Sequence, residues 1–161
     1  MRVLPVMAMV LVAVTACGSP SGAGGERACT MIGTQVGIGL DIEPAAAAKV
    51  DSATLVACWA STCDTQDVVL SPSTAAASTT CTGDKPTDSC SARMTTTGGK
   101  HGFVTLPGLP VEPIRVTVRL SAFPEQTLDV TPKLLYPNGP DCGAGGPQAT
   151  LRVDANGVVS A

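Results

Sequence analysis

A disulfide-linked β-sandwich of seven to nine short antiparallel strands is the fold class that this sequence predicts. Apolar and polar residues alternate in several segments, turn-forming residues recur between those segments, and no sustained helical period is present. Seven cysteines in 161 residues add a further sign, because exported chains of this size commonly use disulfides to stabilise a small core. The fold class is therefore all-β.

The first three strands are expected between residues 34 and 70. A two-residue alternation in 34–42 places four apolar side chains on one face, which predicts a half-buried strand: Val36, Ile38, Leu40 and Ile42. Residues 45–48 are expected to form either a short helical turn or a loop. A second strand is predicted over 50–59, where Trp59, the single tryptophan, is interpreted as a core residue. Residues 67–70 complete a third strand.

Residues 71–89 are expected to form a long loop on the surface, because Ser, Thr, Pro and Asp dominate and no apolar pattern is present. A loop of this length is usually either functional or loosely ordered. A disulfide between Cys81 and Cys90 would favour an ordered excursion. The segment is our first candidate for a recognition surface.

The second half of the chain predicts further short strands separated by turns. Ala92 and Met94 are expected to face inward from a strand over 91–97, and His101 is placed in a glycine-rich turn over 98–102. The alternation in 114–122 is the most regular, and Asn156-Gly157 between apolar runs is a strong hairpin signal. The remaining strands are expected over 103–106, from 128 onward, over 149–153 and over 158–159.

Six cysteines besides Cys17 allow fifteen disulfide pairings. Nearest-neighbour spacing favours three of them: Cys58–Cys63 in a short hairpin, Cys81–Cys90 around a polar loop, and Cys29–Cys142 between an early and a late segment. The connectivity remains open at this point, since spacing alone does not determine it.

Composition and charge exclude several classes of partner. The formal net charge is −3, and the ten Lys and Arg residues are scattered. A nucleic-acid interface would need a basic patch, so no nucleic-acid partner is expected. Only four aromatic residues are present, and the core is therefore expected to consist of Val, Leu, Ile and Ala.

No catalytic set, cofactor or metal site is expected. His101 is the only histidine, and no G-x-S-x-G motif accompanies it. Cys58 and Cys63 lie too far apart in sequence for the C-x-x-C redox motif. The oxygen-bearing loop residues Asp84 with Asp88, and Asp154 near Asn156, do not match the EF-hand spacing. Neither a zinc-ligand pattern nor a phosphate-binding glycine loop is present.

The N-terminal segment has one basic residue, Arg2, and an apolar run of about twelve residues, which is too short for the roughly twenty of a membrane span. Its end, Val14-Thr15-Ala16-Cys17, resembles the lipobox of bacterial lipoproteins. The resemblance implies a signal peptide over 1–16 and acylation of Cys17, with the acyl chains anchoring the protein on the extracytoplasmic face of the cell membrane. An ordinary cleaved signal peptide is the alternative. Residues 17–28, rich in Gly and Ser, would then be a flexible tether to a domain over 29–161.

A second resemblance lies in Gly102-Phe103-Val104-Thr105-Leu106-Pro107-Gly108, which is similar to a pattern in carboxypeptidase-regulatory and fibronectin-like modules. The tyrosine usually found after Pro-Gly is replaced here by Leu109-Pro110. The composition resembles that of a high-GC actinobacterium, and the tail over 137–157 resembles the ending of uncharacterised actinobacterial lipoproteins. Together these features predict an immunoglobulin-like or fibronectin-like domain that serves as a non-catalytic binding or structural module in the cell envelope, with an envelope protein or a glycan as partner. A small envelope hydrolase or thiol oxidoreductase is the alternative.

Overall fold

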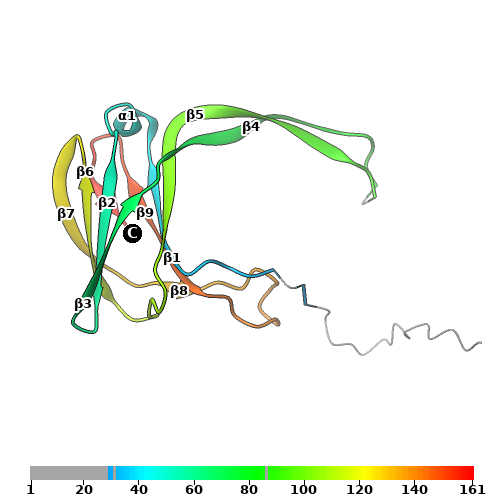
Figure 1. Ribbon diagram of the computed structural model, residues 1–161. Helices are drawn as coiled ribbons and strands as arrows, with labels where there is room; N and C mark the ends of the chain where they lie inside the picture. Colours follow the sequence, from blue (N-terminus) through cyan, green and yellow to red (C-terminus); the bar gives the residue numbers. More distant parts are fainter. Residues whose placement is uncertain (1–28, 31, 86) are drawn as a thin grey trace, which may run out of the picture.

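A computed structural model describes residues 29–30, 32–85 and 87–161 of the chain, and it contains two β-sheets packed face to face with one long hairpin extending from them (Figure 1). The first sheet, sheet A, has the order β10-β9-β1-β5-β4, with β8 also paired to β9; the second, sheet B, has the order β3-β2-β6-β7. In sheet A the strands are β1 (Gly37–Ile42), β4 (Ser71–Cys81), β5 (Cys90–Thr105), β8 (Lys133–Leu134), β9 (Pro147–Val153) and β10 (Val159–Ser160). In sheet B they are β2 (Ala53–Trp59), β3 (Thr62–Val68), β6 (Ile114–Leu120) and β7 (Phe123–Val130).

The core lies between the sheets and consists almost entirely of aliphatic side chains. Alternating residues of the central strands are buried and form one cluster that includes Leu40, Leu55, Val116, Val118 and Leu151, each no more than 1% exposed. None of the described residues with a polar or charged side chain is buried. Removal of each large aliphatic side chain from water contributes roughly 1.5–3 kcal/mol to folding, so this cluster is the main source of stability.

The prediction of purely antiparallel strands was wrong for β1. This strand pairs antiparallel with β5 but parallel with β9, so that Leu40 lies opposite Leu151 in the parallel register. Sheet A is therefore mixed, and the early strand β1 is in its centre. The fold is a two-sheet, mostly β architecture with ten strands in the described residues. Alternation along the chain reports burial of one face but carries no information about the direction of the neighbouring strand.

Two predicted interruptions are in fact strand. Residues 71–89 were expected to be a loop, yet β4 occupies the stretch up to Cys81. The predicted turn over 98–102 lies inside the sixteen-residue strand β5, so His101 is a strand residue. Ala92 and Met94, both expected to face inward, are exposed, Met94 by 55%. Alternation did not reveal β4 because neither of its faces is buried, and the glycines of 98–102 supply no side-chain pattern.

Smaller boundary differences occur elsewhere. Strand β7 ends at Val130, where a strand was expected to begin, and β3 begins already at Thr62. The predicted strand over 114–122 corresponds to β6, and residues 45–48 contribute to the short helix α1 (Pro44–Ala47). Trp59 packs against the core, as predicted.

Three disulfides link the described residues: Cys29–Cys142, Cys58–Cys63 and Cys81–Cys90. These are the three pairs that the spacing favoured. The second joins residues directly opposite each other on β2 and β3, and the third does the same on β4 and β5. The first joins the segment before β1 to the segment before β9, residues that are 113 positions apart.

The β9–β10 hairpin turns at Asn156-Gly157, as the sequence predicts, with φ of +86° at Gly157. The Asp154 carboxylate accepts hydrogen bonds from the backbone N–H groups of Val158 and Asn156, both at 2.8 Å. These hydrogen bonds, that from Val158 first, lower the pKa of Asp154 against the opposing effect of desolvation. Asp154 therefore has a structural role, which is to accept these backbone hydrogen bonds in the turn.

In the part of the chain described by the structure, no helix combines the length and the apolar character needed to cross a bilayer.

Candidate functional site

The hairpin of β4 and β5 extends beyond the core, and the described residues of its outer part contribute no side chain to it. Its strands pair from Ser71 opposite His101 to Cys81 opposite Cys90, whereas β1 covers β5 only between Lys100 and Thr105. Beyond that point both strands leave the body and extend into solvent (Figure 1). We call residues 71–97 the arm.

Side chains on the arm are small and exposed. Ser, Thr and Ala make up most of β4, and every β4 residue except half-buried Ser73 is exposed. Threonine favours extended backbone, which explains how a segment without an apolar face still forms strands. Met94 is the only large apolar side chain of β4 and β5 between Ser71 and Thr97. The arm therefore offers a long surface of hydroxyl and methyl groups.

The far end of the arm is closed covalently and by hydrogen bonds. Cys81–Cys90 joins the two strand ends. Beyond it, the N–H of Thr82 donates to the carbonyl of Ser89 at 3.0 Å, and the Ser89 N–H donates to Thr82 Oγ1 at 3.2 Å. The Asp88 carboxylate accepts the Lys85 N–H at 2.7 Å. Asp88 thus has a role in the turn, and the predicted absence of a calcium site with Asp84 remains an expectation.

The near end of the arm is held against the body. Gly98 has φ of +85°, and a Cβ there would lie 3.3 Å from Cβ of Pro44 in α1, so the chain bends at this point with helix and strand in close contact. Thr97 Oγ1 donates to the Ser73 carbonyl at 3.2 Å across the two strands. Lys100 Nζ donates to the Val50 carbonyl at 2.5 Å. These contacts set the direction in which the arm leaves the sheet.

The only histidine lies at the same junction. Ser73 Oγ and His101 Nδ1 are 3.3 Å apart, and Asp41 is opposite His101 on β1. Serine, histidine and aspartate thus neighbour one another on the exposed face of sheet A. Between Asp41 and His101, both of them described, the structure gives no hydrogen bond or ion pair, so the carboxylate does not orient the imidazole as a catalytic triad requires.

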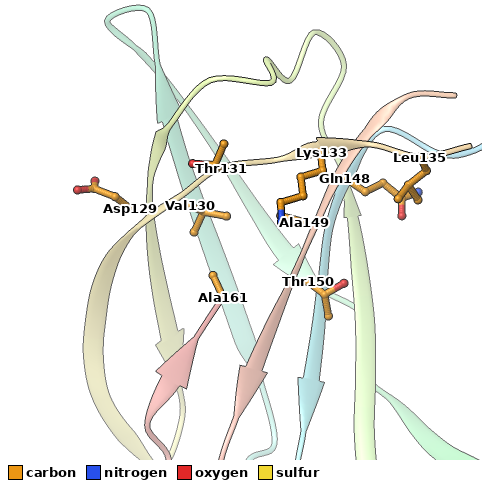
Figure 2. Close-up of a pocket in the computed structure, with 9 residues that line it drawn as sticks. All are labelled: Asp129, Val130, Thr131, Lys133, Leu135, Gln148, Ala149, Thr150 and Ala161. Carbon is orange, nitrogen blue, oxygen red and sulfur yellow. The ribbon is translucent and has the colours of Figure 1, made fainter. Parts of the chain in front are cut away.

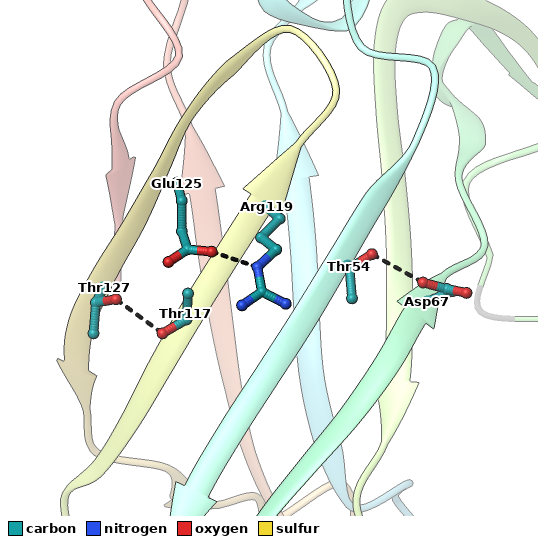
Figure 3. Close-up of polar contacts among 6 residues, drawn as sticks. All are labelled: Thr54, Asp67, Thr117, Arg119, Glu125 and Thr127. Carbon is teal, nitrogen blue, oxygen red and sulfur yellow. Dashed lines mark hydrogen bonds and ion pairs between the residues drawn. The ribbon is translucent and has the colours of Figure 1, made fainter.

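The outer face of sheet B is closed by pairs between neighbouring strands (Figure 3). Thr117 and Thr127 hydroxyls are 2.8 Å apart, and Thr54 donates to Asp67 at 2.9 Å. Arg119 pairs with Glu125, and further along the same strands Arg115 lies 3.7 Å from Asp129. Because these polar groups pair with one another across the strands, we interpret this face as an ordinary solvent-exposed surface. Exposed pairs of this kind contribute little to stability.

A shallow cavity of about 510 Å³ lies at the open edge between β7 and β9 (Figure 2). Its lining combines Val130, Leu135 and Ala149 with polar groups, and the Lys133 side chain points into it, whereas Asp129 points away. No nucleophile–base pair lines it. Nor does any group of three or more His, Cys, Asp or Glu side chains among the described residues have an arrangement able to hold a metal ion.

The predicted site residues are thus distributed over distant parts of the fold. Cys29 and Cys142 lie at the end of the body where β8 and β9 begin, Cys58–Cys63 bridges sheet B, and Cys81–Cys90 closes the arm. Cys17, the signal segment 1–16 and the tether 17–28 lie outside the described residues.

No family model, curated protein or solved structure matches the chain. Function therefore has to be argued from the residues themselves. The arm is the strongest candidate site, because it is exposed, bonded at both ends and, in its described residues, contributes no side chain to the buried core.

Proposed function

We propose that this protein is a lipid-anchored, non-catalytic module of the cell envelope that presents the arm as a contact surface for another protein on the extracytoplasmic side of the membrane. The observation that carries the proposal is the arm itself. A two-stranded hairpin without a packed face is marginally stable in water. Here it is nevertheless closed by a disulfide at one end, and at the other its two strands are joined by the Thr97–Ser73 hydrogen bond next to the part of β5 that Lys100 ties to Val50 of the body.

The rest of the chain supports a binding role more than a catalytic one. The Ser73–His101 contact is exposed and lacks an orienting carboxylate, and the described cysteines are all in disulfides. The body is instead a compact support, whose core ends where the arm begins. We also propose that this two-sheet body is an immunoglobulin-like or fibronectin-like domain.

The anchor rests on the lipobox resemblance at Cys17. Stable attachment to a bilayer requires two or more acyl chains, since each buried methylene contributes only about 0.8 kcal/mol. Cys17→Ala is expected to release the protein into the medium or to block its processing, as followed by membrane fractionation and mass spectrometry of the N-terminus. Fractionation of the variant with membranes at the wild-type level would contradict the anchor, and Cys58→Ala with Cys63→Ala is the control for loss of cysteines elsewhere.

Removal of the arm tests whether it belongs to the folding unit. Pro72 lies opposite Lys100, so Asn-Gly in place of residues 73–99 closes β4 and β5 with a two-residue hairpin turn. We expect the free energy of unfolding to change by no more than about 1 kcal/mol, because no large buried side chain is removed. Denaturant unfolding measures this. A loss of several kcal/mol would show that the arm is part of the stable core.

A photo-crosslinking residue tests the contact itself. Placed at Thr79 on the arm, it is expected to give protein adducts in intact cells, whereas the same residue at Thr65 on β3 is expected to give none. Both positions are exposed strand residues, so accessibility is matched. Equal labelling at the two positions, or none at Thr79, would overturn the proposal.

A further inference from the structure

The free edges of the two sheets differ in how they are protected against pairing with another strand. Exposed edges are normally blunted by charge, proline or short length, because their unpaired N–H and C=O groups are a template for a further strand. Strand β7 carries Pro124, Glu125 and Asp129, and β3 carries Asp64 and Asp67. Strands β8 and β10 have two residues each.

Strand β4 is the exception among the edges described. It is eleven residues long and contains no charged side chain. Its interruptions are Pro72, followed by a register shift between Pro72 and Thr74 at the near end, and an extra residue, Ala77, between the pairs Ala76–Met94 and Ser78–Arg93. Two regular stretches remain, Thr74–Ala76 and Ser78–Cys81.

The distribution of charge indicates which partner this edge suits. Among the described residues outside 71–97, ten acidic and six basic side chains give a net charge of −4. Within 71–97 two acidic side chains, Asp84 and Asp88, balance two basic ones, Lys85 and Arg93. Two copies of the molecule therefore repel each other through their bodies but not through their arms. An eleven-residue strand is roughly 36 Å long, which is several times the Debye length of about 8 Å at physiological salt. Two bodies held apart by the length of this strand therefore repel each other only weakly.

We propose that two copies of this chain associate through antiparallel pairing of their β4 strands, which joins the two arms into one four-stranded sheet, β5-β4-β4-β5. The inference rests on the proposed function, because it names the partner of the arm. A two-fold axis that passes between Ala77 and Ser78 gives both copies the same register, because the extra residue of each copy, Ala77, then lies next to the axis. Thr74, Ala75 and Ala76 face Cys81, Thr80 and Thr79 of the second copy, respectively.

Side chains agree with this register on both faces. Residues alternate between the faces of a strand, and the pairs with β5 place Ala76 and Met94 on the same face as Thr79 and Ala92. Across the joined sheet, one row is therefore Met94, Ala76, and the second copy's Thr79 and Ala92. The small side chains leave room for Met94 to lie across them and lose part of its exposed surface. The opposite face forms a row of Thr95, Ala75, Thr80 and Ser91.

Sedimentation equilibrium of the full chain in density-matched detergent tests the association. We expect a monomer–dimer equilibrium for the wild type. The double variant Ala76→Glu with Thr79→Glu places like charges opposite each other twice and is expected to raise the dissociation constant about tenfold or more. Ala76→Lys with Thr79→Glu places opposite charges in the same positions and is expected to restore it to within about threefold of the wild-type value.

Thr65→Glu with Thr127→Glu adds the same charge to the outer face of sheet B and is expected to leave the dimer unchanged. A wild type that stays monomeric at all concentrations, or a double-glutamate arm variant that dimerises normally, would overturn self-association. Circular dichroism of each variant excludes misfolding as the cause. If the Thr79 crosslinker captures a different protein while the wild type sediments as a monomer, the proposed function survives and this inference fails.

Discussion

Replacement of both Cys29 and Cys142 by serine is expected to lower the free energy of unfolding by about 4 kcal/mol. The bridge closes a loop across 113 positions, and in the chain-entropy model a constraint on the unfolded chain contributes more as the loop lengthens. It also holds the segment before β1 beside the segment before β9, where the two strands begin their parallel pairing. Urea denaturation of the double variant measures the loss.

The matched control is Cys58→Ser with Cys63→Ser. That bridge closes a loop of only five positions on adjacent strands, so the entropy model assigns it a smaller contribution. A loss for the short bridge equal to or greater than that for the long one would contradict the entropic explanation. Removal of both cysteines of a pair leaves no free thiol to exchange with the remaining bridges.

Leu55→Ala is expected to lower the free energy of unfolding by about 2–5 kcal/mol, because deletion of a fully buried side chain leaves a cavity that the core fills only partly. Leu55 lies on β2 between β3 and β6 and has no exposed surface. Its neighbours Val116 and Val118 on β6 are equally buried and belong to strands paired on both edges, so they cannot move far into the space. Thermal and denaturant unfolding measure the change.

Leu134→Ala makes the same substitution at a position that is 42% exposed and lies on the two-residue strand β8. It is expected to cost less than about 1 kcal/mol. Similar losses at the two positions would show that the cluster between the sheets is not the main source of stability.

Sequence patterns predicted the body of the fold because its strands have one buried face. The alternation over 114–122 corresponds to β6, whose buried residues are Ile114, Val116, Val118 and Leu120. Asn156-Gly157 marks the final hairpin, because a residue with positive φ is needed there. Short spacings in the sequence favoured Cys58–Cys63 and Cys81–Cys90, and Cys29–Cys142 was then the pair left over.

Residues 71–89 could be recognised as an exposed polar excursion and 91–97 as a strand, but β4, the first strand of the arm, could not be predicted. Period-two alternation arises only when one face of a strand is buried, and neither face of β4 is. Gly98-Gly99 is typical of a turn, yet here the glycines allow a continuous strand to bend past Pro44. The parallel β1–β9 pairing was also beyond prediction, since it depends on a partner 111 positions away. The sequence therefore placed the candidate surface in residues 71–89, but its form as a two-stranded arm became visible only in three dimensions.

The placement of β1 has a consequence for how the polypeptide matures. Its neighbour on one side, β9, is synthesised long after it, so the centre of sheet A cannot close until residues 147–153 have been synthesised. Contacts so distant along the chain slow folding. The Cys29–Cys142 bridge spans a similar interval and likewise can form only after Cys142 has been synthesised.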